Sequence, residues 1–345
     1  MEEISWNKPK FGTKELELVK KVLETGYVSE GPMTKELEDK LREVVRAKHI
    51  IMTTSATSAL YLAIEADKRI RGYTEGEVII PNLTFLATRQ APELAGLKII
   101  IEDVDNNRFT LDREGGSYDS PNYPKIVIPV NLLGRKVYNF TEDTNSVITQ
   151  IFDNAGCLGS NVQNGKVGCY SLQANKMINC GQGGFCATDD DEYAKVIRQI
   201  KDFGRENKDQ QDTKGFNFKF NDIQAAVVLG QLEKLEEQKR LHIRQYEKYR
   251  NELFTIGKFI KYDLEEGEVP LWIEFITDKR DELFDYLKSK NIQCRKPWLP
   301  LIDNSERYPN TDYYCKNCIW LPNGASLTDN KQNEVIKEIK TFYGI

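Results

Sequence analysis

The sequence predicts an α/β protein with a large domain, whose mostly parallel central sheet is covered by helices, and a smaller C-terminal α+β domain. Three observations support this class. A chain of 345 residues is long enough for about two domains. Short, almost continuously apolar segments recur between residues 49 and 187 with helical stretches between several of them, which is typical of a sheet buried on both faces. A long polar helical segment then precedes a further strand and two helices.

The N-terminal part begins with two helices, a strand and a third helix. From Thr13 to Thr25 apolar residues recur at helical spacing, and Gly26 follows as a C-cap. We expect further helices over Thr34 to Val45 and Thr57 to Ile70, with a strand from His49 to Thr53 between them. The remaining strands of the sheet are expected at Val78 to Ile80, Lys98 to Ile101, Ile126 to Val130, Val147 to Phe152, Cys169 to Leu172 and Phe185 to Ala187.

The C-terminal part begins with the longest helical segment, from Asn221 to Arg250, whose polar second half indicates that it leads out of the large domain. We therefore predict a large domain of residues 1–240 and a small domain of residues 241–345. The elements expected beyond the long helix are a strand from Trp272 to Ile276, a helix from Lys279 to Lys290 and a closing helix from Asp329 to Phe342.

The composition excludes several classes of function. A net charge of -5 argues against nucleic-acid binding, which needs concentrated Lys and Arg. The N-terminus begins with acidic residues and lacks the pattern of a signal peptide, and no apolar run approaches the ~20 residues that cross a bilayer. We expect a cytoplasmic protein that acts on small molecules, with no nucleic-acid or membrane partner.

Cysteine and histidine chemistry is also disfavoured. Seven scattered cysteines are typical of reduced thiols, and the pair Cys315 and Cys318 lacks the further ligands of a zinc site, so we predict no metal. Only His49 and His242 are present, and neither resembles a positioned base for a serine or cysteine nucleophile. Other residues must carry the reaction.

Three features could carry chemistry. Ser55 to Ser58 lies between a strand and a helix, where backbone amides can bind a phosphate, although such residues also cap helices without a ligand. Asp153 ends a predicted strand, at the edge where open α/β folds bind ligands, but it could instead cap a turn. Lys176 lies between a strand and a glycine-rich turn; a lone lysine is nearly always a surface charge, so only the combination is informative.

An ordered set of segments carries a family resemblance. These segments are GYVSEGPMTKELE, SATSAL, PNLTFLAT, VNLLG, FDNAGCLGS, SLQANKMINCGQGG, GFNFKFNDIQAAVVLGQL and WLPNGASLT, in this order along most of the chain. The chain thus resembles the DegT-StrS type of nucleotide-sugar aminotransferases, which are fold type I enzymes that depend on pyridoxal 5'-phosphate (PLP). The resemblance implies the PLP-dependent transferase fold, with residues 1–240 as the cofactor-binding domain.

The resemblance implies two catalytic residues. Lys176 corresponds to the lysine that binds PLP covalently, and its freed amine would move the proton from the donor carbon to the cofactor carbon. Asp153 corresponds to the partner of the pyridine nitrogen. A carboxylate there keeps the nitrogen protonated and so strengthens the electron-withdrawing ring.

The resemblance also implies further cofactor contacts. Phe85 corresponds to an aromatic residue that stacks on the cofactor ring, and the amides of Ala56 and Thr57, with Ser171, correspond to phosphate ligands. Asn217 corresponds to an asparagine that reaches the phosphate from the neighbouring subunit. A homodimer with shared active sites is therefore implied by the resemblance.

The chain departs from the family pattern at four positions. Ala56 replaces a frequent glycine, Asn131 a frequent histidine and Gln182 a frequent glutamate. Gly156 lacks the glutamine or histidine side chain that often contacts the cofactor oxygen or the substrate. These departures leave Lys176 intact but bear on the choice of substrate.

The function implied is transfer of an amino group from L-glutamate to a nucleotide-linked keto-deoxy sugar, expected to be 4-keto-6-deoxy and to serve polysaccharide or glycan assembly. Three alternatives remain open at this point. A sister dehydratase activity goes with histidine in place of the lysine, and a non-catalytic regulatory homologue would be expected to lose Lys176 or Asp153. A more distant amino-acid aminotransferase would need an arginine for the substrate carboxylate, and Arg295 could be that residue.

Overall fold

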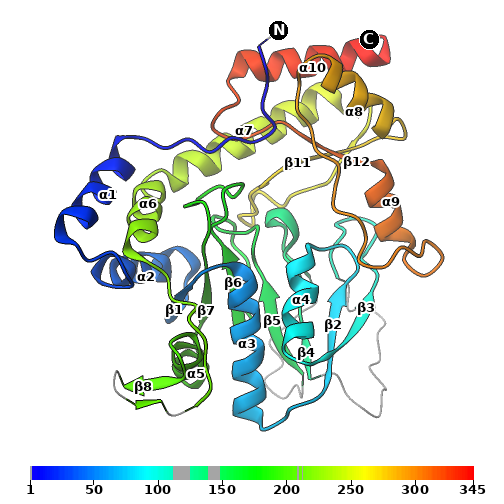
Figure 1. The fold of residues 1–345 in the computed structure, drawn as a ribbon. Coiled ribbons are helices and arrows are strands. Elements are labelled where there is room, and N and C mark those ends of the chain that lie inside the picture. The colour runs from blue at the N-terminus through cyan, green and yellow to red at the C-terminus, as the bar shows by residue number, and fades with distance from the viewer. Residues whose placement is uncertain (1, 112–124, 139–147, 208–209, 212) are drawn as a thin grey trace.

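The protein is described by a computed structural model that covers residues 2–111, 125–138, 148–207, 210–211 and 213–345. Its centre is a seven-stranded sheet with the order β1-β7-β6-β5-β4-β2-β3 (Figure 1). β7 runs antiparallel to both of its neighbours, and all other neighbouring pairs are parallel. The strands are β1 (His49–Thr53), β2 (Glu77–Pro81), β3 (Lys98–Glu102), β4 (Ile126–Val127), β5 (Thr149–Asp153), β6 (Val167–Ser171) and β7 (Gly184–Thr188). The predicted mostly parallel sheet is confirmed.

Alternate residues of the strands are buried on opposite faces, as the pleat requires. Ile51 of β1 packs in one core cluster with the helices α3 (Ala56–Arg71), α4 (Leu86–Leu94) and α5 (Asp191–Lys201). Ile50 and Met52 pack in another cluster, with α2 (Pro32–Val45) and α6 (Asp222–Leu232). The helix α1 (Thr13–Thr25) lies against α6 (Figure 1). The sheet is thus buried on both faces, which is why its strands are apolar almost throughout.

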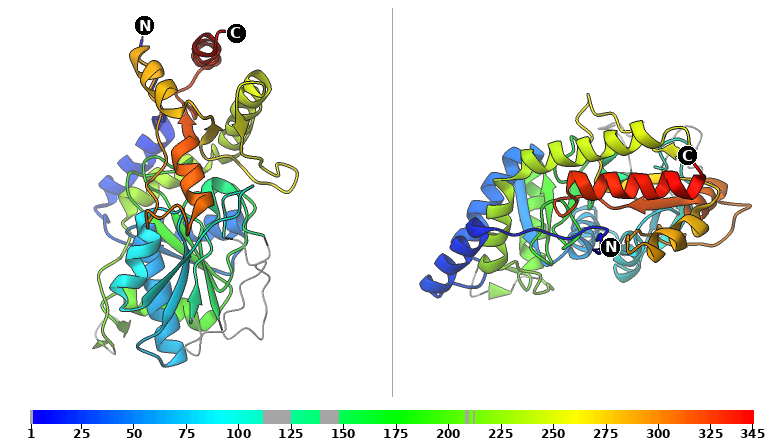
Figure 2. Two further views of the ribbon diagram at one scale, coloured as in Figure 1. Left: turned by 90° about the vertical axis from the view of Figure 1, so that its right-hand side faces the viewer. Right: turned by 90° about the horizontal axis from the view of Figure 1, so that it is seen from above.

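A second, smaller layer of structure lies beyond the carboxyl ends of the parallel strands. Its antiparallel sheet has the order β10-β11-β12, and α7 and α10 run side by side over it (Figure 2). Ile4 packs into its core, so both ends of the chain meet there. The elements are α7 (Leu235–Leu253), β10 (Lys258–Phe259), β11 (Ile273–Ile276), α8 (Arg280–Ser289), α9 (Pro309–Asn317), β12 (Cys318–Leu321) and α10 (Asp329–Tyr343). The remaining elements are the turn η1 (Leu132–Gly134) and the hairpin of β8 (Arg205–Asn207) and β9 (Gln210–Gln211).

The expected single helix from Asn221 to Arg250 is wrong in one respect, because the chain bends between α6 and α7. Lys234 leaves helical geometry with φ -101° and ψ 1°, and its ammonium pairs with the buried Glu15 of α1 at 2.6 Å. No proline or glycine marks this break in the sequence. The predicted domain boundary at residue 240 falls inside α7 and stays a prediction. Within the described residues, no helix is both long and apolar enough to cross a membrane.

Candidate active site

A cavity of about 420 Å³, here called the inner pocket, lies at the carboxyl edge of the large sheet. The strands β1, β2, β5 and β6 all point toward this edge, and the chain that follows each of them supplies lining residues. Six of the seven residues predicted from the sequence line it, namely Ala56, Thr57, Phe85, Asp153, Ser171 and Lys176. Segments more than 100 residues apart therefore meet at one site.

One end of the inner pocket is the N-terminus of α3. Ser55 caps the helix, because its hydroxyl accepts a hydrogen bond from the Ser58 amide at 3.1 Å. The amides of Ala56 and Thr57 have no partner within the helix, as in the first turn of any α-helix. Gly184 of β7 lets this turn approach the sheet, since a Cβ there would lie 2.4 Å from the Ala56 nitrogen. Ser171 ends β6 at the same edge. This end of the pocket can bind a phosphate.

Asp153 lies in the floor of the inner pocket and is only 4% exposed. One carboxylate oxygen accepts a hydrogen bond from the Thr88 hydroxyl at 2.7 Å, and the other from the Ala155 amide at 3.0 Å. Thr84 lies 2.6 Å from the Thr88 hydroxyl and extends this chain. Burial raises the pKa of Asp153, while these hydrogen bonds and the charge of Lys176 oppose the rise. The carboxylate is held in one orientation and lacks a strong counter-charge.

Lys176 projects from a tightly bonded turn into the inner pocket. Its ammonium lies 5.3 Å from the centre of the Trp272 ring, and no hydrogen bond or ion pair to it is found among the described residues. The neighbouring Asn175 carbonyl accepts hydrogen bonds from Asn7 and from the Trp272 indole, which fix the turn to two distant segments. Burial lowers the pKa of Lys176 to about 8, although Asp153 opposes this shift. A fraction of the amine is thus neutral near pH 7.

Aromatic side chains form the outer wall of the inner pocket. Phe85 is 51% exposed in the single subunit, and its ring centre lies 5.7 Å from that of Trp298. Trp298 in turn contacts Trp272 with 5.8 Å between ring centres. The exposure of Phe85, at a position that lines the pocket, leaves its ring available to stack on a planar ligand.

Asn217 does not line the inner pocket. It is exposed and lies beside Phe216 and Phe218, which pack on Tyr61 of α3, while its backbone bridges to Asp202. The prediction assigned Asn217 to the active site of a neighbouring subunit, and an exposed position away from the pocket of its own subunit is compatible with that assignment.

The segment of η1 that lines the inner pocket is held by a buried ion pair. Leu133 has φ 54°, and its carbonyl accepts a hydrogen bond from the Leu271 amide at 3.0 Å. Two residues on, the fully buried Arg135 pairs with the equally buried Glu274 of β11. The Tyr262 hydroxyl donates to Glu274 at 2.8 Å, and Tyr314 donates to it as well. Burial alone would lower the pKa of Arg135, but the charge of Glu274 and its hydrogen bond to Arg135 hold that pKa well above its usual value.

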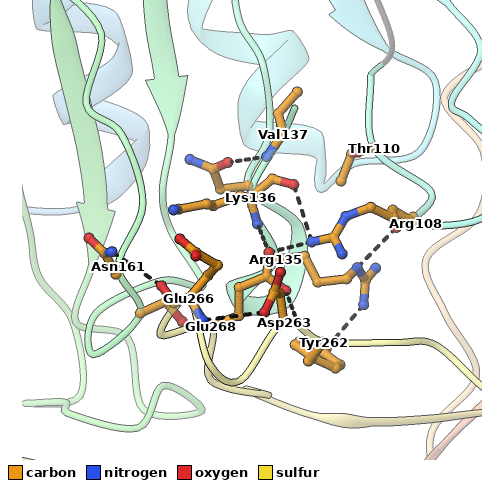
Figure 3. Close-up of polar contacts among 12 residues, drawn as sticks. Arg108, Thr110, Arg135, Lys136, Val137, Asn161, Tyr262, Asp263, Glu266 and Glu268 are labelled. Atoms are coloured by element: carbon orange, nitrogen blue, oxygen red, sulfur yellow. Dashed lines mark hydrogen bonds and ion pairs between the residues drawn. The ribbon is translucent and has the colours of Figure 1, made fainter. Parts of the chain in front are cut away.

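A second charged contact reinforces the same junction (Figure 3). The buried Glu268 pairs with Arg108 and accepts hydrogen bonds from the backbone amides of Lys136 at 2.8 Å and Asp263 at 2.7 Å. Figure 3 shows Arg108, Arg135 and Lys136 converging on the segment that carries Tyr262 and Glu268. Sequence reasoning missed this network, because its members are spread over more than 160 residues and look like ordinary surface charges.

The inner pocket fits PLP in three respects. A helix N-terminus can receive the phosphate, Phe85 can stack on the ring, and a buried carboxylate opposite a lysine suits a protonated ring nitrogen and an aldehyde. A positive ring nitrogen would also supply the counter-charge that Asp153 lacks. Fold and site together define the protein as a fold type I PLP-dependent enzyme. The chain belongs to the DegT/DnrJ/EryC1/StrS aminotransferase family, whose model matches residues 9–340.

Solved structures share this fold over the whole chain. A putative sugar aminotransferase from Streptococcus pneumoniae in its PMP form is 20% identical over 98% of this chain and 97% of its own, with a TM-score of 0.90. A Helicobacter pylori aminotransferase involved in pseudoaminic acid biosynthesis is 20% identical over 100% of both chains, with a TM-score of 0.87. An E. coli GDP-4-keto-6-deoxy-D-mannose-3-dehydratase with bound hydrated PLP is 20% identical over 98% of this chain and 99% of its own, with a TM-score of 0.85.

The lowered pKa of Lys176 gives a first prediction. In protein freed of cofactor, labelling by a reagent that attacks neutral amines should reach half its maximal rate at Lys176 near pH 8, because burial disfavours the ammonium. Peptide mapping by mass spectrometry after short pulses at pH 6 to 11 measures the rate, with the other lysines as an internal reference. If Lys176 follows the same pH profile as the bulk of the lysines, its amine is not desolvated.

The buried ion pair gives a second prediction. Glu274→Gln should lower the free energy of unfolding by about 3–5 kcal/mol, because Arg135 is then buried without a counter-charge. Glu24→Gln, which breaks an exposed pair with Lys20, should change it by less than about 1 kcal/mol. Urea unfolding followed by tryptophan fluorescence measures both. Arg135→Met combined with Glu274→Leu should recover much of the loss, and equal stability of Glu274→Gln and the unchanged protein would contradict this account.

Proposed function

We propose that the protein is a PLP-dependent aminotransferase that moves an amino group from L-glutamate to a nucleotide-linked keto-deoxy sugar, with a 4-keto-6-deoxy sugar as the expected acceptor. The observation that carries the proposal is the meeting of Lys176 and Asp153 in one pocket beneath an exposed aromatic ring. Membership of the DegT/DnrJ/EryC1/StrS aminotransferase family supports the reaction class. Two structural neighbours, a putative sugar aminotransferase and an aminotransferase involved in the biosynthesis of pseudoaminic acid, support the kind of acceptor. Polysaccharide or glycan assembly would use such a product.

Each residue of the inner pocket has a separate role in the proposed reaction. PLP, when bound, supplies the conjugated ring that withdraws electrons from the carbon that loses its proton. Lys176 Nζ, partly neutral because it is buried, can take that proton and return it to a neighbouring carbon. Asp153, oriented by Thr88, stabilises a positive charge on the ring nitrogen. Trp272 and Trp298 line the same pocket, and the centre of the Trp272 ring lies 5.3 Å from the Lys176 ammonium.

The dehydratase alternative is disfavoured by the lysine. One structural neighbour is a sugar 3-dehydratase, so the fold alone does not separate the two activities. In the family pattern that activity goes with histidine at the position of Lys176, and the chain has only His49 and His242, neither of which lines the inner pocket. A regulatory homologue without catalysis is disfavoured for the same reason, because both catalytic side chains are present.

We propose further that the active form is a homodimer with shared active sites. Asn217 lies outside the pocket of its own subunit but is exposed, and the neighbouring Phe203 and Phe216 are 44% and 40% exposed. Exposed aromatic residues around a predicted ligand of the partner's cofactor support contact between subunits there.

The reaction class is tested by cofactor absorption. L-glutamate should bleach the visible absorption of the holoenzyme, and one keto-sugar nucleotide from a panel should restore it with formation of the amino sugar. Lys176→Ala should slow this exchange by roughly 10²–10⁴-fold, and Asp153→Asn by at least about a hundredfold. The matched control is Lys166→Ala, at the opposite end of β6, which should behave like the unchanged enzyme. A deoxy product without nitrogen would instead establish the dehydratase reaction.

The shared site is tested by complementation. Lys176→Ala and Asn217→Ala proteins should each be weakly active alone, and a mixture that has exchanged subunits should recover up to about a quarter of normal activity, because half of the dimers then hold one intact site. Light scattering measures the assembly, and the spectral assay measures the recovery. A dimer that exchanges subunits without any gain in activity would place Asn217 outside the partner's site.

A further inference from the structure

A second cavity of about 870 Å³, here called the outer cavity, adjoins the inner pocket. Gln173, Asn175 and Arg295 line both, so the two spaces meet at these side chains. The N-terminal segment forms one wall of the outer cavity, where Ile4 pairs with Ile292 and Trp6 lines the space. The outer cavity is about twice as large as the inner pocket.

Arg295 lies at the junction with its charge unpaired. Its backbone is fixed to β12 by two hydrogen bonds with Trp320, of 3.0 and 2.7 Å. Its guanidinium lies 4.8 Å from the centre of the Trp6 ring, and among the described residues it forms no hydrogen bond or ion pair. Apart from Lys176, Arg295 is the one cationic side chain among the described residues that line the inner pocket. An anion that enters from either space meets this arginine.

Two buried polar atoms near the junction also lack partners. The indole nitrogen of Trp6 and the side-chain oxygen of Asn175 are buried without a hydrogen bond to any described residue. Trp6 is 6% exposed and lines the outer cavity, and Asn175 lines both spaces. Buried polar groups are normally satisfied, so unsatisfied ones beside a cavity indicate that a polar ligand belongs there.

We propose that Arg295 binds the diphosphate of the sugar nucleotide and that the outer cavity holds the nucleoside. This inference rests on the proposed function and names its substrate subsite. In a nucleotide-linked 4-keto sugar the keto carbon and the phosphate lie on opposite sides of the sugar ring. With the keto carbon beside Lys176, the phosphates therefore point out of the inner pocket. The Arg295 guanidinium lies against the Trp6 ring and the Lys176 ammonium against the Trp272 ring, and the centres of these two rings are 5.0 Å apart.

The carboxylate next to the amino group of a donor amino acid has a different position. It is bonded to the carbon that reacts, so it must lie close to Lys176. A guanidinium whose N–H groups form no other hydrogen bonds can also donate two parallel hydrogen bonds to phosphate oxygens. We therefore expect Arg295 to contribute to binding of the keto-sugar nucleotide but not to binding of L-glutamate.

Arg295→Gln tests this division in the holoenzyme. The variant should raise the KM for the accepted keto-sugar nucleotide at least roughly tenfold, since a charge-assisted hydrogen bond is lost. Its rate of cofactor bleaching by L-glutamate should change less than about twofold. Arg295→Lys should restore part of the loss. The control is Lys296→Gln, which removes the neighbouring charge, paired with Asp281 and outside both cavities, and should leave both reactions unchanged.

A binding measurement separates this inference from the proposed function. UDP, dTDP and GDP are each added alone, and at least one of them should quench the tryptophan fluorescence of the protein. Arg295→Gln should weaken the binding of that nucleotide at least roughly tenfold. The corresponding nucleoside should bind the two proteins alike. Nucleotide binding that depends on Arg295, in a protein that transfers no amino group, would retain the subsite and reject the aminotransferase. Slower glutamate bleaching with unchanged nucleotide binding, or no effect of Arg295→Gln on either, would overturn the subsite.

Discussion

The candidate site depends on a buried ion pair between Arg135 and Glu274, because the pocket lies at the junction that this pair holds together. Arg135 belongs to the segment that leaves the large sheet, and Glu274 belongs to β11 of the small sheet. The hydroxyls of Tyr262 and Tyr314 donate further hydrogen bonds to the carboxylate oxygens of Glu274. Such a pair contributes little net stability when complete, but either charge alone is costly. The pair fixes the large sheet and the small sheet in one relative arrangement, and this arrangement sets the shape of the inner pocket.

Within the pocket, burial drives the side chains of Asp153 and Lys176 toward their neutral forms. It raises the pKa of Asp153 and lowers that of Lys176 to about 8. The same desolvation thus prepares a lysine that is partly a free amine and a carboxylate that lacks a strong counter-charge. A cationic heterocycle between them would satisfy the carboxylate without protonating the lysine. In the proposed function, cofactor affinity and proton transfer would therefore share one physical origin, the burial of both side chains.

Local sequence patterns were sufficient for most of the large sheet. Continuous apolar runs mark its strands, and the helix from Thr13 to Thr25 has the predicted ends. Local patterns did not reveal the bend at Lys234, where no proline or glycine interrupts the sequence and the ammonium pairs with Glu15 from the far end of the chain. For the site, the resemblance selected six residues that the fold brings together. The threonines that orient Asp153 and the four clustered tryptophans were missed, since residues brought together only by tertiary packing leave no periodic signal.

Gly156, where the chain departs from the family pattern, is closely packed on the side of Leu133 and Leu271. A Cβ at this position would lie 3.3 Å from the backbone of Leu133 and from the side chain of Leu271, so the neighbours already fill the space of a larger residue. Leu133 has φ 54°, and its carbonyl accepts a hydrogen bond from the Leu271 amide. A side chain at position 156 would therefore have to displace Leu133 and Leu271 by a few tenths of an ångström. Under the proposed function, recognition of the acceptor would then fall to other lining residues, such as Trp272, Trp298 and Arg295 from the C-terminal part of the chain.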